Sequence, residues 1–180
     1  EVGDHLFVGK FAYGYSRHSL PLGLHKLPIA EGKKIFSRLP KRGDVAVFRN
    51  PKNDLVMIKR VIGLPGDKVA VTNGRLIVND QIIDRKALEA FLYRQHAKKG
   101  SRGSVVGVDS YTEQFSGEKK PHTIYEQTDQ GQLDNVGPFV VPQGHVFFMG
   151  DNRDNSVDSR APLGPGFDVE PPMLCRGADG

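Results

Sequence analysis

Apolar residues along this chain fall into short runs with the two-residue period of β-strands. Asn73-Gly74 separates two of these runs, and the dipeptide favours the positive φ angles of a two-residue hairpin turn. Only residues 85–98 look helical, because Leu88, Phe91 and Leu92 have the i, i+3, i+4 spacing of a helix face. The pattern therefore predicts a mainly β fold, with strands at 6–8, 45–48, 56–62, 68–71, 75–78, 139–141 and 146–149.

The composition changes at about Asp84. From there to Asn135 the chain is rich in Gln, Lys, Ser, Gly and Glu, and apolar strand patterns resume only at Phe139. We interpret residues 84–135 as a small inserted domain within a β core formed by residues 1–83 and 136–180. A long loop is the alternative interpretation.

Charge and cysteine content narrow the class of protein. The 25 Lys and Arg exceed the 21 Asp and Glu only slightly, and they form scattered pairs, so we expect no nucleic-acid partner and favour a nearby anionic membrane surface. The single Cys175 excludes an internal disulfide and a cysteine-based zinc cluster, and we predict no metal or cofactor. No stretch approaches the ~20 apolar residues of a membrane span. The start at Glu1 does not resemble a signal peptide, so we expect a piece of a longer protein.

Lys59 is the first candidate for chemistry. The strand period places it on the same face as Met57 and Val61. Burial disfavours the charged ammonium, so a lysine among apolar neighbours can act as a general base near neutral pH. The abrupt end of the strand at residues 63–67 indicates an opening onto a cleft. A lysine at a sheet edge, with its ammonium in water, is the alternative.

A polar segment at residues 150–160 directly follows an apolar strand. Some of its residues have the spacing of calcium ligands, but Val157 stands where the glycine of such a loop should be, and Leu163 replaces the bidentate glutamate. We therefore interpret it as a loop in which carboxylates pair with arginines and hydroxyls face a site. An ordinary turn rich in Asn, Asp and Ser is the alternative.

Four segments of the chain together resemble bacterial type I signal peptidase, also called leader peptidase. They occur in the family's order across nearly the whole chain: Gly3-Asp4 with Lys10 to Gly14, Pro40 to Val45, Ile58 to Asp67, and Gly150 to Arg160. The resemblance implies a membrane-bound serine endopeptidase with a Ser-Lys dyad on a mainly β scaffold. Such an enzyme removes signal peptides from exported preproteins after an Ala-x-Ala sequence, and its catalytic domain lies on the outer, periplasmic side of the bacterial cytoplasmic membrane.

The resemblance also assigns roles to residues. It makes Lys59 the general base and Ser156 the hydroxyl that orients it. It gives supporting roles to five further residues, which are Gly150, Asp151, Arg153, Asp158 and Arg160. Four strand residues match positions that line the small-residue pockets, namely Leu6, Val47, Met57 and Ile58. The family commonly has Tyr in place of Met57, which changes the expected shape of the first pocket.

The nucleophilic serine is expected outside this chain. In the family it lies in a Ser-Met-x-Pro-Thr-Leu-x-x-Gly-Asp segment, whose end matches Gly3-Asp4, so it belongs a few residues before Glu1. Ser16 and Ser19 lie in a different block. We therefore expect the 180 residues alone to be inactive. A further departure is the sequence at 167–172, where the family usually has Phe-Val-Pro before a closing strand.

Two other functions stay open from the sequence. A self-cleaving repressor also uses Ser and Lys on a β scaffold, but it carries a DNA-binding helical domain and lacks the 151–160 segment. A non-catalytic β-rich binding module would make Lys59 merely structural. Apolar and aromatic residues near the start are expected to rest on a bilayer or to pack under a loop, and these are Phe11, Tyr13, Tyr15, Leu20, Leu22 and Leu24.

Overall fold

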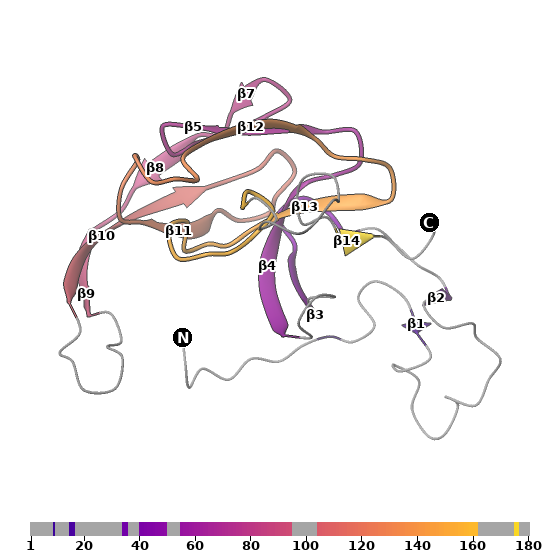
Figure 1. The fold of residues 1–180 in the computed structure, drawn as a ribbon, viewed down its shortest axis with the longest axis horizontal. Helices are drawn as coiled ribbons and strands as arrows, with labels where there is room; N and C mark the ends of the chain where they lie inside the picture. Colours follow the sequence, from indigo (N-terminus) through magenta and orange to yellow (C-terminus); the bar gives the residue numbers. More distant parts are fainter. Residues whose placement is uncertain are drawn as a thin grey trace, which may run out of the picture.

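The computed structural model describes residues 9, 15–16, 34–35, 40–49, 55–94, 104–161 and 175–176, and every regular element among them is a β-strand (Figure 1). The strands are β1 (Tyr15–Ser16), β2 (Lys34–Ile35), β3 (Val45–Arg49), β4 (Val56–Gly63), β5 (Lys68–Thr72), β6 (Arg75–Val78), β7 (Gln81–Ile82), β8 (Arg85–Ala87), β9 (Phe91–Arg94), β10 (Val105–Glu113), β11 (His122–Glu126), β12 (Asn135–Val140), β13 (His145–Met149) and β14 (Cys175–Arg176). The predicted mainly β class is confirmed.

The longer strands form three sheets of four strands each within the described ranges. One has the order β14-β13-β4-β3, and a second has the order β12-β5-β6-β7. In the third, β10 lies between β11 and β8 and also pairs with β9. All of these pairings are antiparallel.

Most predicted strands occur where the apolar pattern placed them. The runs at 45–48, 56–62, 68–71, 75–78 and 146–149 correspond to β3, β4, β5, β6 and β13. The run at 139–141 belongs to β12, which already begins at Asn135. The expected strand at 6–8 and the expected bilayer contacts near the start lie outside the described residues, except for the backbone of Tyr15 in β1.

The hairpin predicted at Asn73-Gly74 is confirmed. Thr72 pairs with Arg75 across the two-residue turn that joins β5 to β6. Asn73 has φ 47° and Gly74 has φ 70°, the left-handed angles that a type I′ turn requires at both positions. The local sequence therefore determines the register of this hairpin.

The helix predicted at 85–98 is wrong for the part that the structure describes. Residues 85–87 and 91–94 form β8 and β9, and both strands pair with the long strand β10. The apolar residues that suggested a helix face stay exposed, with Leu92 at 77%. The pairing with β10 instead holds both segments as strands. None of the described residues forms a helix that could span a membrane.

The second half of β4 and most of β13 are buried on both faces. Val61 and Phe148 contact one hydrophobic cluster, while Ile62 and Phe147 contact the other. The first cluster also contains Ala46 and Val146, and the larger one extends over β5 and β6. Because successive strand residues point to opposite faces, burial on both sides explains why Val61-Ile62 and residues 146–149 are continuously apolar.

The third sheet lies entirely within residues 85–126, which is part of the predicted insertion. It is not isolated from the core, because Phe115, which follows β10, belongs to the same buried cluster as Ile62 and Phe147. Figure 1 shows β10 and β11 lying beside the layer that contains β5 and β12. The boundaries of the insertion at 84 and 135 stay a prediction.

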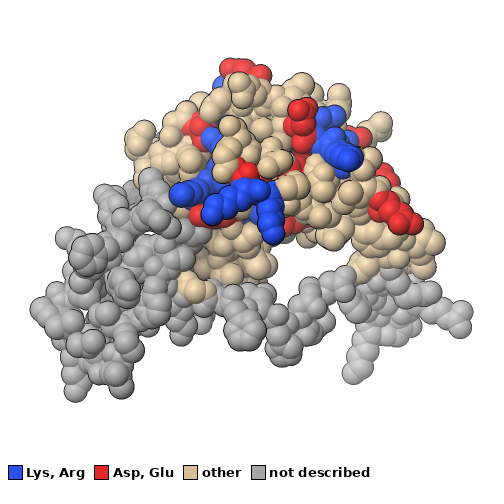
Figure 2. Space-filling model, turned by 180° about the vertical axis from the view of Figure 1, so that it is seen from behind, with Lys and Arg blue, Asp and Glu red and all other residues tan. Residues whose placement is uncertain are grey.

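Charged groups at the surface are mixed in sign. Figure 2 shows basic side chains in separate groups on the face behind that of Figure 1, with acidic side chains beside them. Lys68 and Asp80 form one exposed ion pair, with 2.8 Å between Nζ and Oδ1. Exposed pairs contribute only about 0–1 kcal/mol each. We therefore attribute the stability of the fold mainly to the apolar clusters.

We predict that Gly63→Ala destabilises the protein. A Cβ atom at this position would lie 2.8 Å from Val69 Cγ2, 2.9 Å from Val141 Cγ2 and 3.0 Å from Phe147 Cβ. Overpacking of this kind costs about 1–3 kcal/mol. Urea denaturation measures the change, and Gly107→Ala is the control, because nothing lies within 4 Å of a Cβ there. Equal stability of the two variants would contradict this account of the core.

Candidate active site

A pocket of about 440 Å³ opens where β4 meets the segment that follows β13. Strands β3 and β4 contribute one group of lining residues, and the segment after β13 contributes another. Tyr125 of β11 completes the lining. The residues are Val45, Ile58, Lys59, Arg60, Tyr125, Gly150, Asp151, Asn152, Asn155 and Ser156.

Lys59 and Ser156 meet in this pocket although they are 97 residues apart in the sequence. Lys59 Nζ donates a hydrogen bond of 2.6 Å to Ser156 Oγ. Gly150 allows this approach, because a Cβ there would lie 2.1 Å from Ser156 Oγ and 3.5 Å from Lys59 Nζ. Ser156 itself is buried. The hydroxyl therefore holds the amine in one position.

The surroundings of Lys59 lower the pKa of its ammonium from the usual value of 10.5. Burial is the largest cause, since it removes water from the charged form. The charge of Asp158 opposes this shift, the charge of Arg160 adds to it, and Asp151 has a smaller opposing effect. The net result shifts the equilibrium toward the neutral amine, which is the form that accepts a proton.

Asp158 and Arg160 form a buried ion pair next to this amine. Arg160 Nε donates to Asp158 Oδ1 at 3.0 Å, and Arg160 Nη2 donates to Oδ2 at 3.0 Å. The backbone N–H of Gly150 also donates to Asp158 Oδ2, at 2.9 Å. Burial alone would raise the pKa of Asp158, but the hydrogen bonds and charge of Arg160, together with backbone N–H groups, lower it. Asp158 therefore stays ionised.

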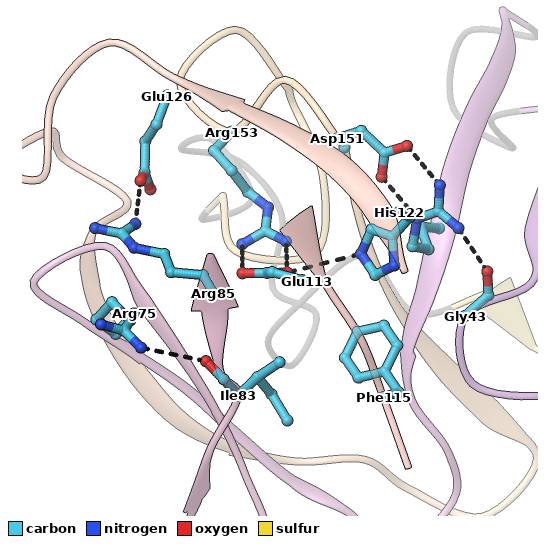
Figure 3. Close-up of polar contacts among 12 residues, drawn as sticks. Gly43, Arg75, Ile83, Arg85, Glu113, Phe115, His122, Glu126, Asp151 and Arg153 are labelled. Atoms are coloured by element: carbon cyan, nitrogen blue, oxygen red, sulfur yellow. Dashed lines mark hydrogen bonds and ion pairs between the residues drawn. The ribbon is translucent and has the colours of Figure 1, made fainter. Parts of the chain in front are cut away.

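Asp151 connects the polar segment to strand β4. Arg60 Nε and Nη2 donate to the two carboxylate oxygens of Asp151 at 2.8 and 2.7 Å. Arg60 Nη1 donates to the carbonyl oxygen of Gly43 at 2.7 Å, as Figure 3 shows beside Asp151. A bidentate pair of this kind restrains both position and orientation. The start of the segment is thus fixed relative to the residue that follows Lys59.

Arg153 connects the same segment to β10 through a fully buried ion pair with Glu113 (Figure 3). Arg153 Nη1 donates to Glu113 Oε1 at 3.2 Å, and Nη2 donates to Oε2. Burial favours the neutral acid, but the charge of Arg153 prevails and lowers the pKa of Glu113. His122 lies beside this pair, with 3.7 Å between its Nε2 and Glu113 Oε2.

Strand β11 adds a backbone connection. Tyr125 N–H donates to the carbonyl of Asp151 at 2.8 Å, and Arg153 N–H donates to the carbonyl of Tyr125 at 2.9 Å. Asp154 Oδ2 accepts hydrogen bonds from the backbone N–H groups of Gln127 at 2.5 Å and Thr128 at 3.2 Å. The sheet built from residues 85–126 therefore supports one side of the candidate site.

The structure brings most of the sequence-predicted site residues together around Lys59. Ile58 lines the pocket, Val47 pairs with it across the β3–β4 ladder, and Met57 pairs with Phe48. Neither Val47 nor Met57 is among the residues that line this pocket. Leu6 lies outside the described residues.

Sequence reasoning did not identify Glu113 or Tyr125 as site residues. Glu113 and its partner Arg153 are 40 residues apart in the sequence, so no local spacing of residues predicts their contact. Glu113 is buried, but it does not follow the alternation of β10, whose other buried residues are Val108 and Ser110. The strand pattern therefore gave no signal of its burial beside a distant arginine. Within the described ranges, no His, Cys, Asp and Glu side chains gather in a set that could hold a metal ion.

The family described as signal peptidase, peptidase S26, matches residues 1–168, and the chain belongs to this family. The signal peptidase I of Rickettsia typhi (strain ATCC VR-144 / Wilmington) is 38% identical over 164 residues, which cover 89% of this chain and 59% of that protein. The signal peptidase I of Rickettsia prowazekii (strain Madrid E) is 37% identical over 164 residues with the same coverage. The chain thus spans 59% of the length of these relatives.

A solved structure is also similar. It is a crystal structure of a signal peptidase I from Enterococcus faecalis V583, with a TM-score of 0.35 and 24% sequence identity. The match covers 68% of this chain and 86% of that chain.

We predict that Lys59 titrates below 10.5 and that Asp158→Asn lowers its pKa further. The Asp158 carboxylate raises the pKa of the ammonium, so removing the charge leaves burial and Arg160 to act against the charged form. NMR titration of the lysine side-chain resonances measures both values. A higher pKa for Lys59 in Asp158→Asn would contradict this electrostatic account.

Proposed function

We propose that this protein is the catalytic part of a membrane-bound serine endopeptidase that removes N-terminal signal peptides from exported preproteins. The observation that carries the proposal is the hydrogen bond of 2.6 Å between Lys59 Nζ and Ser156 Oγ, which orients a half-buried lysine whose pKa is lowered. Membership of the signal peptidase family supports this activity, as do relatives named signal peptidase I. The proposed partners are signal peptides and the lipid surface, with no nucleic acid.

In the proposed mechanism the neutral amine of Lys59 is the general base. It takes the proton from a serine hydroxyl while that oxygen attacks the carbonyl carbon of the scissile bond. The resulting ammonium then gives the proton to the leaving amine, so the peptide bond breaks and an ester with the serine forms. Lys59 next takes a proton from a water molecule while the water oxygen attacks the ester carbonyl carbon. The bond from that carbon to the serine oxygen breaks, the Lys59 ammonium returns the proton to the serine oxygen, and the signal peptide leaves with a free carboxylate end.

The serine nucleophile is proposed to be other than Ser156. Ser156 Oγ is buried and held between Gly150 and Lys59, which suits an orienting hydroxyl better than an attacking group. The resemblance of Gly3-Asp4 to the end of the family's serine motif supports an attacking serine upstream of that dipeptide. The amine of Lys59 then contacts two hydroxyl groups. That of Ser156 orients the amine toward the hydroxyl of the attacking serine.

Specificity for Ala-x-Ala is proposed to come from the β3–β4 hairpin. Ile58 is half exposed beside Lys59 in the pocket, and Val47 lies opposite it in the ladder. Branched apolar side chains at the surface of a strand leave shallow pockets that accept methyl groups. Leu6 and Met57 are proposed to complete these pockets. We further propose that the catalytic domain lies on the periplasmic side of the bacterial cytoplasmic membrane.

We predict that Lys59→Met abolishes cleavage of a signal-peptide substrate by the full-length protein. The substitution keeps the volume of the side chain but removes the base, so kcat/KM should fall at least about 10³-fold. A fluorogenic peptide containing Ala-x-Ala measures the rate. The exposed Lys68→Met is the matched control and should retain the wild-type rate.

Retained cleavage by a folded Lys59→Met variant would eliminate the dyad and favour a protease of a different mechanism. The 180 residues without the upstream serine are a second comparison. We expect them to bind the peptide and not to hydrolyse it, because the base is present without its nucleophile. Cleavage by this shorter chain that depends on Lys59 would place the nucleophile within it.

We predict a smaller effect for Ser156→Ala, which removes a hydrogen bond to Lys59 but no reacting atom. Loss of such a bond to a charged or proton-accepting group lowers the rate about 10- to 100-fold. A serine-directed covalent inhibitor separates the two roles of serine. Ser156→Ala should still be labelled, and mass spectrometry should locate the label on another serine. A label on Ser156 in the wild-type protein would make Ser156 the nucleophile instead.

A further inference from the structure

The pocket beside Lys59 is larger than the proposed Ala-x-Ala specificity requires. An alanine side chain is a single methyl group, whereas the pocket measures about 440 Å³, within the range of sites that take drug-sized ligands. Among the predicted small-pocket residues that the structure describes, Ile58 lines it, whereas Val47 and Met57 do not. The pocket therefore has room for a part of the substrate beyond the small residues.

The order of residues along β4 indicates how the bound substrate would run past Lys59. Met57 and Ile58, assigned to the small-residue pockets, precede the base Lys59. Arg60 follows Lys59 and binds Asp151, which is joined to Tyr125 by a backbone hydrogen bond of 2.8 Å. In the proposed mechanism the residues before the cleaved bond bind along Met57 and Ile58, which precede the base. The part of the pocket lined by Arg60 and Tyr125 is then available to the residues after the bond.

Tyr125 is held in place as a wall of this pocket. Its backbone is hydrogen-bonded on both sides of Asn152, to Asp151 and to Arg153. The ring of Phe91 packs edge-on against its ring, with 5.6 Å between centroids and an interplanar angle of 90°. A side chain fixed in both backbone and ring position presents a preformed aromatic surface, which lowers the entropic cost of binding.

The polar lining suits a neutral peptide segment. Arg60 and Asp151 neutralise each other through a bidentate pair. Asn152 and Asn155 are exposed in the pocket, and amide groups can donate to and accept from a peptide backbone. Aromatic surface beside paired charges favours an apolar or aromatic side chain, since an unpaired charge there would lose hydration.

We propose that Tyr125 determines specificity for the substrate residue that follows the cleaved bond, and that this subsite takes an apolar or aromatic side chain. The inference rests on the proposed function and extends it to the first residue of the released protein. It also gives the sheet of β8 to β11 a direct part in recognition. Tyr125 acts by contact with the substrate and not through Lys59.

The test is a set of peptides that are identical except for Phe, Leu, Gly or Asp directly after the Ala-x-Ala sequence. In the full-length wild-type protein, kcat/KM should be higher for Phe and Leu than for Gly and Asp. Tyr125→Ala should reduce the Phe-to-Gly ratio by about 3- to 10-fold, the amount that one aromatic contact contributes. Tyr125→Phe should keep the ratio, because the ring remains. The ratio does not depend on the fraction of each variant that is folded.

Tyr93→Ala is the matched control, since Tyr93 lies in β9 and does not line the pocket. Its ratio should equal that of the wild type. Tyr125→Leu serves as a second variant that keeps apolar volume if Tyr125→Ala does not fold. An unchanged ratio in folded Tyr125→Ala, or in Tyr125→Leu where the alanine variant does not fold, would overturn the inference.

The proposed function can fail separately from this inference. If the wild-type protein cleaves none of the peptides, the endopeptidase proposal fails, and binding of the same peptides is then measured by fluorescence anisotropy. Tighter binding of the Phe peptide than of the Gly peptide, lost in Tyr125→Ala, would still support an aromatic subsite. Equal binding of all peptides would overturn it.

Discussion

The buried ion pair between Arg153 and Glu113 is the constraint on which the candidate site depends. Both side chains are almost fully buried, at 2% and 1% exposed. Two charges in such surroundings are tolerated only as partners, since removal of either leaves an uncompensated charge in the interior. The pair therefore holds the segment after β13 against β10. Ser156 and Asp158 lie on that segment, so their position relative to Lys59 follows from a contact made outside the pocket.

The same principle explains the chemistry of Lys59. Burial lowers the pKa of the Lys59 ammonium. The carboxylate of Asp158 opposes this lowering, and the charge of Arg160 adds to it. The pKa of the amine is thus set by a balance of three nearby groups and burial. This balance is what distinguishes a usable base from a surface lysine. The balance depends on the contact between β4 and the 150–160 segment, where Lys59 Nζ lies 2.6 Å from Ser156 Oγ.

Regular alternation predicted the fold well where strands are bounded by strong turn residues. The β5–β6 hairpin was predictable because Asn73 and Gly74 adopt the positive φ angles that they favour. The segment from Arg85 was not, because its apolar spacing fits a helix locally. Pairing with β10, a strand that comes later in the chain, decided its conformation. Tertiary hydrogen bonds here outweigh a local preference that amounts to a few tenths of a kcal/mol per residue.

For the site, the sequence by itself determined which residues are chemically suited to the task. Lys59 within an apolar strand and the polar residues of 150–160 were identifiable, because burial of a lysine and clustering of carboxylates with arginines have direct chemical meanings. Only the tertiary structure decided that Lys59 meets Ser156, that Arg153 binds Glu113 and that Tyr125 lines the pocket. These contacts join strands far apart in the chain. Their geometry depends on sheet packing, which no local pattern encodes.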